Sequence, residues 1–299
     1  MRLPQNRRYI PQVPGPGAEK VRDPQHVGRL WRIIAAVIVV VLLVWRPLGL
    51  GAVVKPIRTD FVAMRHIQSA AGAAAARPMD RAKVAGMVDR AVQVAPENRV
   101  VTRYAGLLYM SAGSYEKAAR HLSRLEERDL LTDANLGHCL LLSGQREAGT
   151  RLLSNVAAGV RAQRQLGAIS AMEYAVYLNN IGYAYAAGDV ELDQALAMSV
   201  EAVQIQPLQP AFIDSLGWAY YQSREYERAM FYLERAVRLG GEGNSAENYY
   251  HLGAAYARMG RIRPAAEALA KALRYDPQYQ EAAAELRKLG YALPQPARA

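Results

Sequence analysis

The chain has 299 residues but a single cysteine, Cys139, and only five scattered histidines. One thiol cannot form a disulfide within the chain, and no two histidines stand one helical turn apart, the spacing that a metal site on one helix needs. His138 directly precedes Cys139, so on a helix the two side chains point about 100° apart and cannot act as base and nucleophile. We expect Cys139 to be a small buried hydrophobe.

Motifs that carry chemistry are lacking as well. The sequence has no glycine-rich phosphate-binding loop and no Gly-x-Ser-x-Gly motif. Acidic pairs such as Glu126-Glu127 lie in polar stretches typical of a solvated surface. We therefore expect no catalytic residue, no metal site, no cofactor and no small-molecule substrate. An enzyme subunit would need a convergent polar cluster that the sequence does not show.

Runs of alternating apolar and polar residues are also lacking, although 51% of the chain is hydrophobic. A half-buried strand requires that alternation, whereas the apolar residues here recur at helical spacing. The sequence thus predicts an all-α fold.

The net charge of +10 is unevenly placed. Residues 1–58 hold ten Lys and Arg against two carboxylates, so the remaining 241 residues carry only +2. A nucleic-acid-binding protein would need the excess on its folded surface. The charge distribution argues against a nucleic-acid partner.

The clearest pattern lies in residues 210–239, where two apolar stripes at helical spacing flank a polar break at 222–225. The first stripe is Ile213, Leu216, Gly217 and Tyr220, and the second is Tyr226, Ala229, Leu233, Ala236 and Val237. So short a joint predicts an antiparallel helical hairpin. Gly217 costs about 1 kcal/mol of helix propensity relative to Ala, which indicates that the paired helix packs closely against it.

The pattern repeats along the chain. Gly182, Gly217 and Gly253 are 35 and 36 residues apart, and each follows Leu or Ile and precedes a Tyr by three positions. Weaker copies surround Gly106 and Gly137, and residues 88–96 look like the closing helix of a further copy. Between Ala157 and Glu173 the spacing lengthens, so either a second helix is extended there or the connection is irregular.

This arrangement resembles the tetratricopeptide repeat, a helix-turn-helix unit of about 34 residues that stacks into a solenoid. The resemblance implies about five to six repeats in residues 99–291, including a C-terminal capping helix, and a free tail at 292–299. For residues 55–98 we expect a linker and a weak first helical pair, in which Asp80 caps a helix over 81–94.

The N-terminal region predicts a membrane anchor. Residues 1–28 form a Pro- and Arg-rich tail, and residues 29–54 contain an uncharged apolar run at 33–45 between Trp31 and Arg46. A cleaved signal peptide and a buried soluble helix remain alternatives. We expect a single-pass protein of the bacterial inner membrane, with the repeats favoured on the extracytoplasmic side.

The resemblance also implies a function, because first helices of such repeats line a concave groove that holds a partner's peptide or helix. The residues expected there are Asn179, Tyr183, Asp214, Trp218, Tyr221, Tyr250 and Arg258, with Arg103 and Leu107 in the weaker copies. Trp, Tyr and Arg are enriched at binding hot spots. For the tyrosines, packing against a neighbouring repeat is an equal alternative, whereas the groove is favoured for Trp218 and Asp214. We expect a non-catalytic membrane-anchored scaffold that assembles an envelope or membrane complex; a secreted or periplasmic chaperone-like subunit released by signal cleavage is the alternative.

Overall fold

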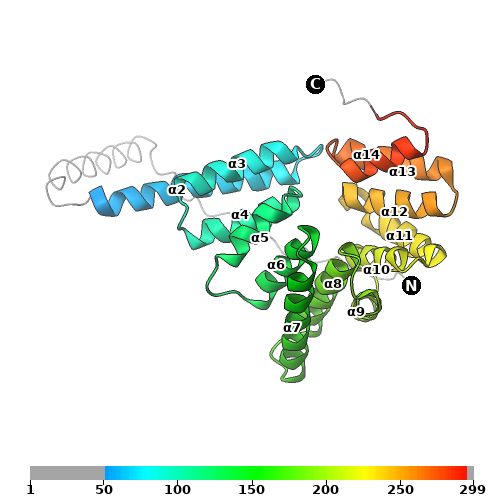
Figure 1. Cartoon of the computed structure of the whole chain (residues 1–299), viewed down its shortest axis with the longest axis horizontal. Coiled ribbons are helices and arrows are strands. Elements are labelled where there is room, and N and C mark those ends of the chain that lie inside the picture. Colours follow the sequence, from blue (N-terminus) through cyan, green and yellow to red (C-terminus); the bar gives the residue numbers. More distant parts are fainter. Residues whose placement is uncertain (1–50, 295–299) are drawn as a thin grey trace, which may run out of the picture. The chain divides into compact units, whose positions relative to one another are not determined.

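The structure, a computed structural model, describes residues 51–294 (Figure 1). Within this range the chain forms thirteen α-helices, labelled α2 to α14, one short 3-10 helix and no strand. The prediction of an all-α fold is confirmed for these residues. Contacts divide the chain after Ile57 into two units, and the helical pairs and the cavity belong to the second, Arg58–Ala299.

Most of the predicted membrane anchor lies outside the described residues, as does the whole N-terminal tail. Only residues 51–54 of the anchor are described, and they open α2 (Gly51–Ala75). None of the helices between residues 51 and 294 combines the length and the hydropathy that a membrane span requires.

Five helical pairs follow one another along the chain, each joined by a short turn. They are α4 (Arg99–Ser111) with α5 (Tyr115–Ser123), α6 (Leu130–Leu142) with α7 (Arg146–Gln165), α8 (Ala171–Ala187) with α9 (Leu192–Ile205), α10 (Pro210–Gln222) with α11 (Tyr226–Gly240), and α12 (Ala246–Arg258) with α13 (Ile262–Tyr275). The 3-10 helix η2 (Gly241–Gly243) precedes α12, and α14 (Gln280–Lys288) packs on α13. The order is that of a helical solenoid with a C-terminal cap.

In each of these pairs the second helix packs closely against a glycine of the first. A Cβ added at Gly217 would lie 2.7 Å from Cγ of Leu233, sixteen residues later, and one at Gly253 would lie 2.7 Å from Cγ of Leu269. The same offset joins Gly106 to Leu122 and Gly137 to Leu153, both at 2.6 Å, whereas an added Cβ at Gly182 meets Ser199 Oγ at 2.8 Å. The close approach predicted at Gly217 is confirmed, and it recurs in each of these five pairs.

The turns between paired helices also share one position, seven residues after that glycine. It holds Gly113, Gly144 and Gly260, all with positive φ, and in the other two pairs Asp189 (φ 51°) and Arg224 (φ 63°). Glycine adopts this left-handed conformation without a Cβ clash, so Arg224 occupies it at a cost.

The lengthened spacing after Ala157 is explained by α7, which runs for 20 residues and ends at Gln165. The second helix is thus extended, the first of the two predicted alternatives. Ser170 then begins α8 with a capping box in which its hydroxyl accepts from Glu173 N and the Glu173 carboxylate accepts from Ser170 N.

Residues 55–98, where a linker and a weak first helical pair were expected, hold most of α2 and all of α3 (Arg81–Val94). Asp80 caps α3 as predicted, since its carboxylate accepts from Lys83 N at 2.9 Å. Ala63 and Ile67 of α2 belong to the same buried cluster as Val88 of α3. The prediction of a linker from residue 55 was wrong, because α2 already begins at Gly51 and continues without a break.

Candidate functional site

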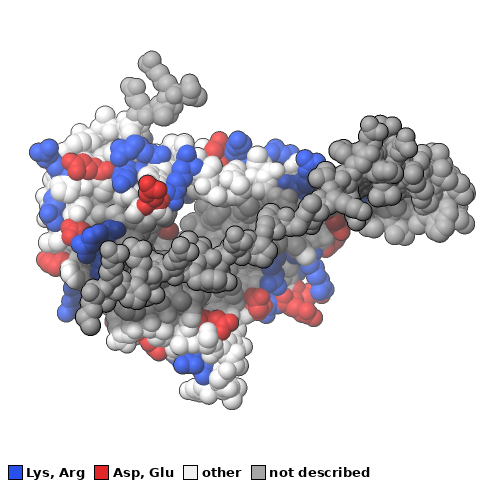
Figure 2. Space-filling view, turned by 180° about the vertical axis from the view of Figure 1, so that it is seen from behind, with Lys and Arg blue, Asp and Glu red and all other residues white. Residues whose placement is uncertain are grey.

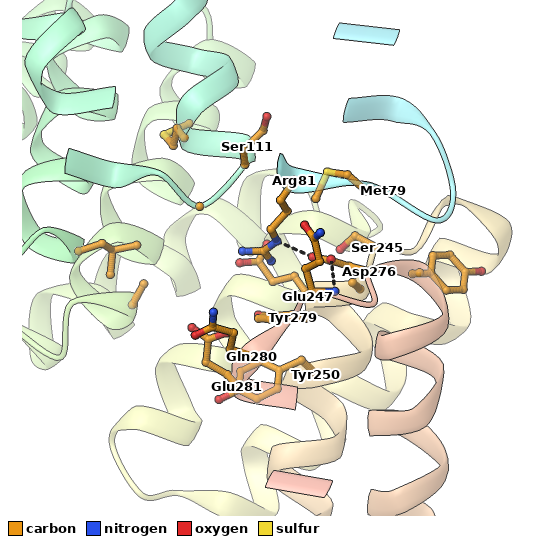
Figure 3. Close-up of a pocket in the computed structure, with 18 of the residues that line it drawn as sticks. Met79, Arg81, Ser111, Ser245, Glu247, Tyr250, Asp276, Tyr279, Gln280 and Glu281 are labelled. Carbon is orange, nitrogen blue, oxygen red and sulfur yellow. Dashed lines mark hydrogen bonds and ion pairs between the residues drawn. The ribbon is translucent and has the colours of Figure 1, made fainter. Parts of the chain in front are cut away.

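A cavity of about 1680 Å³ lies against the first helices of the pairs (Figure 3). Sites for small molecules usually measure about 300–1,000 Å³, so this space is large enough for a segment of another polypeptide. Its aromatic lining is supplied by Tyr115, His138, Tyr183, Trp218, Tyr250, His251, Tyr275 and Tyr279.

Three of these side chains occupy one repeat position. His138, Tyr183 and Trp218 each follow the glycine at which the helical pair closes. Successive residues of a helix are about 100° apart, so a side chain next to that glycine points away from the paired helix. This register is visible in the sequence and would have identified His138 as a cavity residue.

The rings form a nearly continuous row across the cavity. The ring centroids are separated by 6.1 Å between Tyr115 and His138, by 5.5 Å between His138 and Tyr183, and by 6.1 Å between Tyr183 and His251. His251 in turn stacks on Trp218 at 4.1 Å. Offset and edge-to-face rings at such distances attract one another and present broad apolar faces.

His251 is held by a buried carboxylate. Its Nδ1 lies 2.8 Å from Oδ2 of Asp214, and both side chains are almost inaccessible. Burial alone lowers the pKa of His251, but the charge and the hydrogen bond of Asp214 raise it above its ordinary value. Asp214 Oδ1 has no hydrogen-bond partner among the described residues. The pair fixes the orientation of the His251 ring beneath Trp218.

The predicted groove residues separate into two groups. Tyr183, Trp218 and Tyr250 line the cavity, although Trp218 is only 7% exposed and stacks on Tyr221 at 4.6 Å. The other four are absent from the lining: Asn179 (9% exposed) and Asp214 (4%) are buried, and Arg258 Nε donates to the Tyr221 hydroxyl at 3.2 Å. The structure therefore brings three of the seven predicted residues to the cavity wall. Asp214, which was expected on the groove surface, is instead buried beneath the wall.

One edge of the cavity is formed by a contact between distant parts of the chain. Arg81 Nε lies 2.6 Å from Oδ2 of Asp276, and Met79 N donates to the carbonyl of Tyr275 at 3.0 Å (Figure 3). The Arg81 guanidinium also lies 5.0 Å from the centroid of Tyr279. Sequence reasoning missed this contact, which joins the start of α3 to the segment before α14; we call it the clasp.

Reactive chemistry has little support in the described part of the chain. Cys139 is buried, as predicted, and burial raises the pKa of its thiol to about 12. Burial lowers the pKa of His138 to about 4. No three His, Cys, Asp or Glu side chains gather as metal ligands between residues 51 and 294.

On the face seen in Figure 2, Lys and Arg are interspersed with Asp and Glu.

The family model of the tetratricopeptide repeat matches residues 214–239 and 246–288. These stretches are tetratricopeptide repeats. They comprise most of α10, α11, α12, α13 and α14, so the repeat match covers the Trp218 and His251 side of the cavity. No curated protein sequence matches this chain.

Several solved structures are similar to the chain at low identity. The first repeat domain of Spaghetti (RPAP3), bound to an HSP90 peptide, is 23% identical, with 39% of this chain and 90% of that one covered and a TM-score of 0.35. MamA from Desulfovibrio magneticus RS-1 is 20% identical, with 60% and 95% covered and a TM-score of 0.39. TTC0263, a protein of Thermus thermophilus, is 17% identical, with 70% and 90% covered and a TM-score of 0.35. The assignment of tetratricopeptide repeats rests on the family-model match and not on these structures.

Proposed function

We propose that this chain is a non-catalytic scaffold that binds a segment of a partner protein in the aromatic cavity. The observation that carries the proposal is the row of rings from Tyr115 to Trp218, in a space larger than a small molecule needs. Tyr and Trp supply large contact area at low cost in side-chain entropy, so a wall of such rings suits an extended peptide or a helix.

The scaffold is anchored in the membrane through residues 29–54 and supports the assembly of an envelope or membrane complex. The support for this part is the uncharged run at 33–45 with its flanking Trp and Arg. The bacterial inner membrane, with the repeats on the extracytoplasmic side, is the location that we propose.

Site-specific photocrosslinking tests the binding site. A photoreactive amino acid in place of Tyr183, which lines the cavity, should capture a discrete partner, whereas the same group in place of Tyr232 should not. Tyr232 is a matched control, because it is a half-buried tyrosine on α11 outside the cavity lining. Equal capture at the two positions, or none at Tyr183, would refute a binding site in the cavity.

Extraction of membranes with alkaline carbonate tests the anchor. The full-length chain should remain in the membrane pellet with its N-terminus intact, because a hydrophobic span resists this treatment. Release into the supernatant with a trimmed N-terminus would instead favour the secreted or periplasmic chaperone-like subunit. Release of an untrimmed chain would contradict both the anchor and the cleaved signal peptide.

A further inference from the structure

Glu247 is a carboxylate at the cavity without a cationic partner. It lies in the first turn of α12 and belongs to the cavity lining. Within residues 58–294 no Lys, Arg or His lies within ion-pair distance of it; its charge also raises the pKa of His251, but that ring pairs with Asp214. Asp276, another carboxylate of the lining, differs because Arg81 neutralises it at 2.6 Å.

Tyrosines from three other elements share the cavity with this carboxylate. Tyr183 of α8 donates its hydroxyl hydrogen to Oε1 of Glu247. Burial and then the charge of Glu247 raise the pKa of Tyr183, and the same two causes, in that order, raise the pKa of Tyr115 to about 12 and that of Tyr279 above its ordinary value. Glu247 therefore acts on the rings of α5, α8 and the segment before α14.

A second carboxylate adds to the negative field. Glu281 lines the cavity (Figure 3) and raises the pKa of Tyr115, Tyr250 and Tyr279 further. Arg81 opposes it at Tyr115, but Asp276 neutralises the Arg81 guanidinium. Arg77 and Arg287 also line the cavity, but Arg77 donates to the carbonyls of Glu242 and Gly243 and lies over Tyr275. The excess of negative charge is therefore local to the tyrosines beside Glu247 and Glu281, where carboxylates and π faces both attract a cation.

The chain itself places cations on tyrosine rings of this kind. The Arg81 guanidinium lies 5.0 Å from the centroid of Tyr279, and Nζ of Lys117 lies 5.2 Å from that of Tyr109 while it pairs with Asp89 at 2.9 Å. In the second case Tyr109 also donates to Asp89 at 2.6 Å. Tyr183 and Glu247 have the same arrangement as Tyr109 and Asp89, but among residues 58–294 no side chain takes the place of Lys117 as an ion-pair partner of Glu247.

We propose that the cavity recognises a basic segment of the partner protein, whose Lys or Arg side chain pairs with Glu247 and lies on the rings of Tyr115 and Tyr183. This inference rests on the proposed function and names the chemistry of the partner. The carboxylate of Glu247 beside these rings favours a basic occupant at this point of the cavity over an acidic or purely apolar one. The exposed carboxylate of Glu247 fixes the position of the cation, and the rings add a cation–π contact to the pair.

An array of immobilised nonapeptides tests the inference with the detergent-solubilised full-length chain. The flanking positions are randomised and the central residue is fixed as Lys, Arg, Leu or Glu. Peptides with central Lys or Arg should retain at least tenfold more protein than those with Leu, and those with Glu should retain the least. The Glu247→Gln variant should bind Lys and Arg peptides no better than Leu peptides, because the amide keeps the shape and removes the charge.

Glu267→Gln is the matched control, because Glu267 is an exposed carboxylate on α13 outside the cavity lining. It should keep the full preference for Lys and Arg. If Glu247→Gln lowers the thermal midpoint, Tyr115→Leu gives a second reading, since it removes a cation-binding face and keeps apolar bulk. It should reduce the Lys and Arg preference at least threefold.

The outcomes separate this inference from the proposed function. Retention that ignores the central charge, or a preference that survives Glu247→Gln, overturns the basic partner and leaves peptide binding intact. Equal loss in Glu267→Gln also overturns it, since general surface charge would then explain the preference. If no peptide of any class is retained, both the inference and peptide binding in the cavity are wrong.

Discussion

Replacement of Gly217 by Ala measures how tightly a helical pair closes. The added Cβ would lie 2.7 Å from Cγ and 2.9 Å from Cδ2 of Leu233, and 3.1 Å from the backbone N of that residue. A Cβ is rarely so close to another heavy atom, and because backbone is involved, rotation of Leu233 alone cannot relieve the clash. Overpacking costs about 1–3 kcal/mol, and Ala regains about 1 kcal/mol of helix propensity.

We therefore expect Gly217→Ala to lower the free energy of unfolding by up to about 2 kcal/mol, and Gly217→Leu to lower it by more. Gly86 is the matched control, because it lies within α3 and nothing stands within 4 Å of an added Cβ. Gly86→Ala should stabilise the chain by roughly 0.5–1 kcal/mol through propensity alone. The two substitutions are chemically identical, so the opposite signs report packing.

Hydrogen exchange of the full-length chain in detergent is the assay, because repeat arrays deviate from two-state unfolding. Protection should fall in α10 and α11 and, through neighbour coupling, in α9 and α12. Leu233→Ala removes the two side-chain contacts but not the one with the backbone N, so it should reduce the extra penalty of Gly217→Ala in a double-mutant cycle without abolishing it. If Gly217→Ala is as stabilising as Gly86→Ala, the close approach of α10 and α11 is refuted.

Four further changes test separate features of the fold. Arg224→Gly should stabilise the chain by roughly 0.5–1 kcal/mol, measured as increased exchange protection in α10 and α11, since φ is 63° and the side chain is exposed. Reduced protection there would contradict the left-handed turn. Arg81→Ala removes the partner of the 2% exposed Asp276 side chain and should lower the free energy of unfolding by roughly 2 kcal/mol or more. Exchange protection should fall at residues 77–82 and 275–279, and unchanged protection at these residues would exclude the clasp. The pKa of His138 falls to about 4 in the fold, so as the pH drops from about 6.5 the unfolded chain takes up a proton at this residue before the folded chain does. The free energy of unfolding should therefore decline by at most about 3 kcal/mol by pH 4. His138→Gln should make this decline less steep, and an unchanged dependence on pH would contradict the burial of His138. Trp218→Ala should lower the free energy of unfolding by about 3–5 kcal/mol, and with it the thermal midpoint, since the ring is 7% exposed. An unchanged midpoint with weaker partner binding would show that Trp218 contacts the partner and does not stabilise the fold.

Much of the fold was predictable because it depends on local pattern. The stripe around Gly217 recurs at Gly182 and Gly253, and a helix with one apolar face and a short joint has few ways to bury that face other than a hairpin. The cap at Asp80 followed from side-chain chemistry within three residues of the helix start. The start of α2 was misjudged, since Gly51 and Pro56 are ordinary signals of a linker yet both lie inside the helix.

The cavity was only partly predictable. Tyr183 and Trp218 follow the glycine of their helix by one residue and were predicted at the wall. His138 occupies the same position after Gly137, but it was not predicted there. Asp214 is four residues from Trp218 and so shares its helix face, but its carboxylate is buried against His251 of a neighbouring pair. Which of two residues on one face meets the solvent depends on the next helix pair, and helical spacing alone does not contain that information.

By itself the sequence determined the repeated helical hairpin, because the spacing of glycines and apolar residues acts within one pair. Only the tertiary structure decided how successive pairs turn relative to one another, and with it the clasp between Arg81 and Asp276, nearly 200 positions apart. Small rotations between neighbouring pairs add up along a solenoid, so the meeting of its ends depends on every interface in between. For the same reason the position of the Glu247 carboxylate beside these tyrosines appears only when the rings of α5, α8 and α12 lie around one cavity.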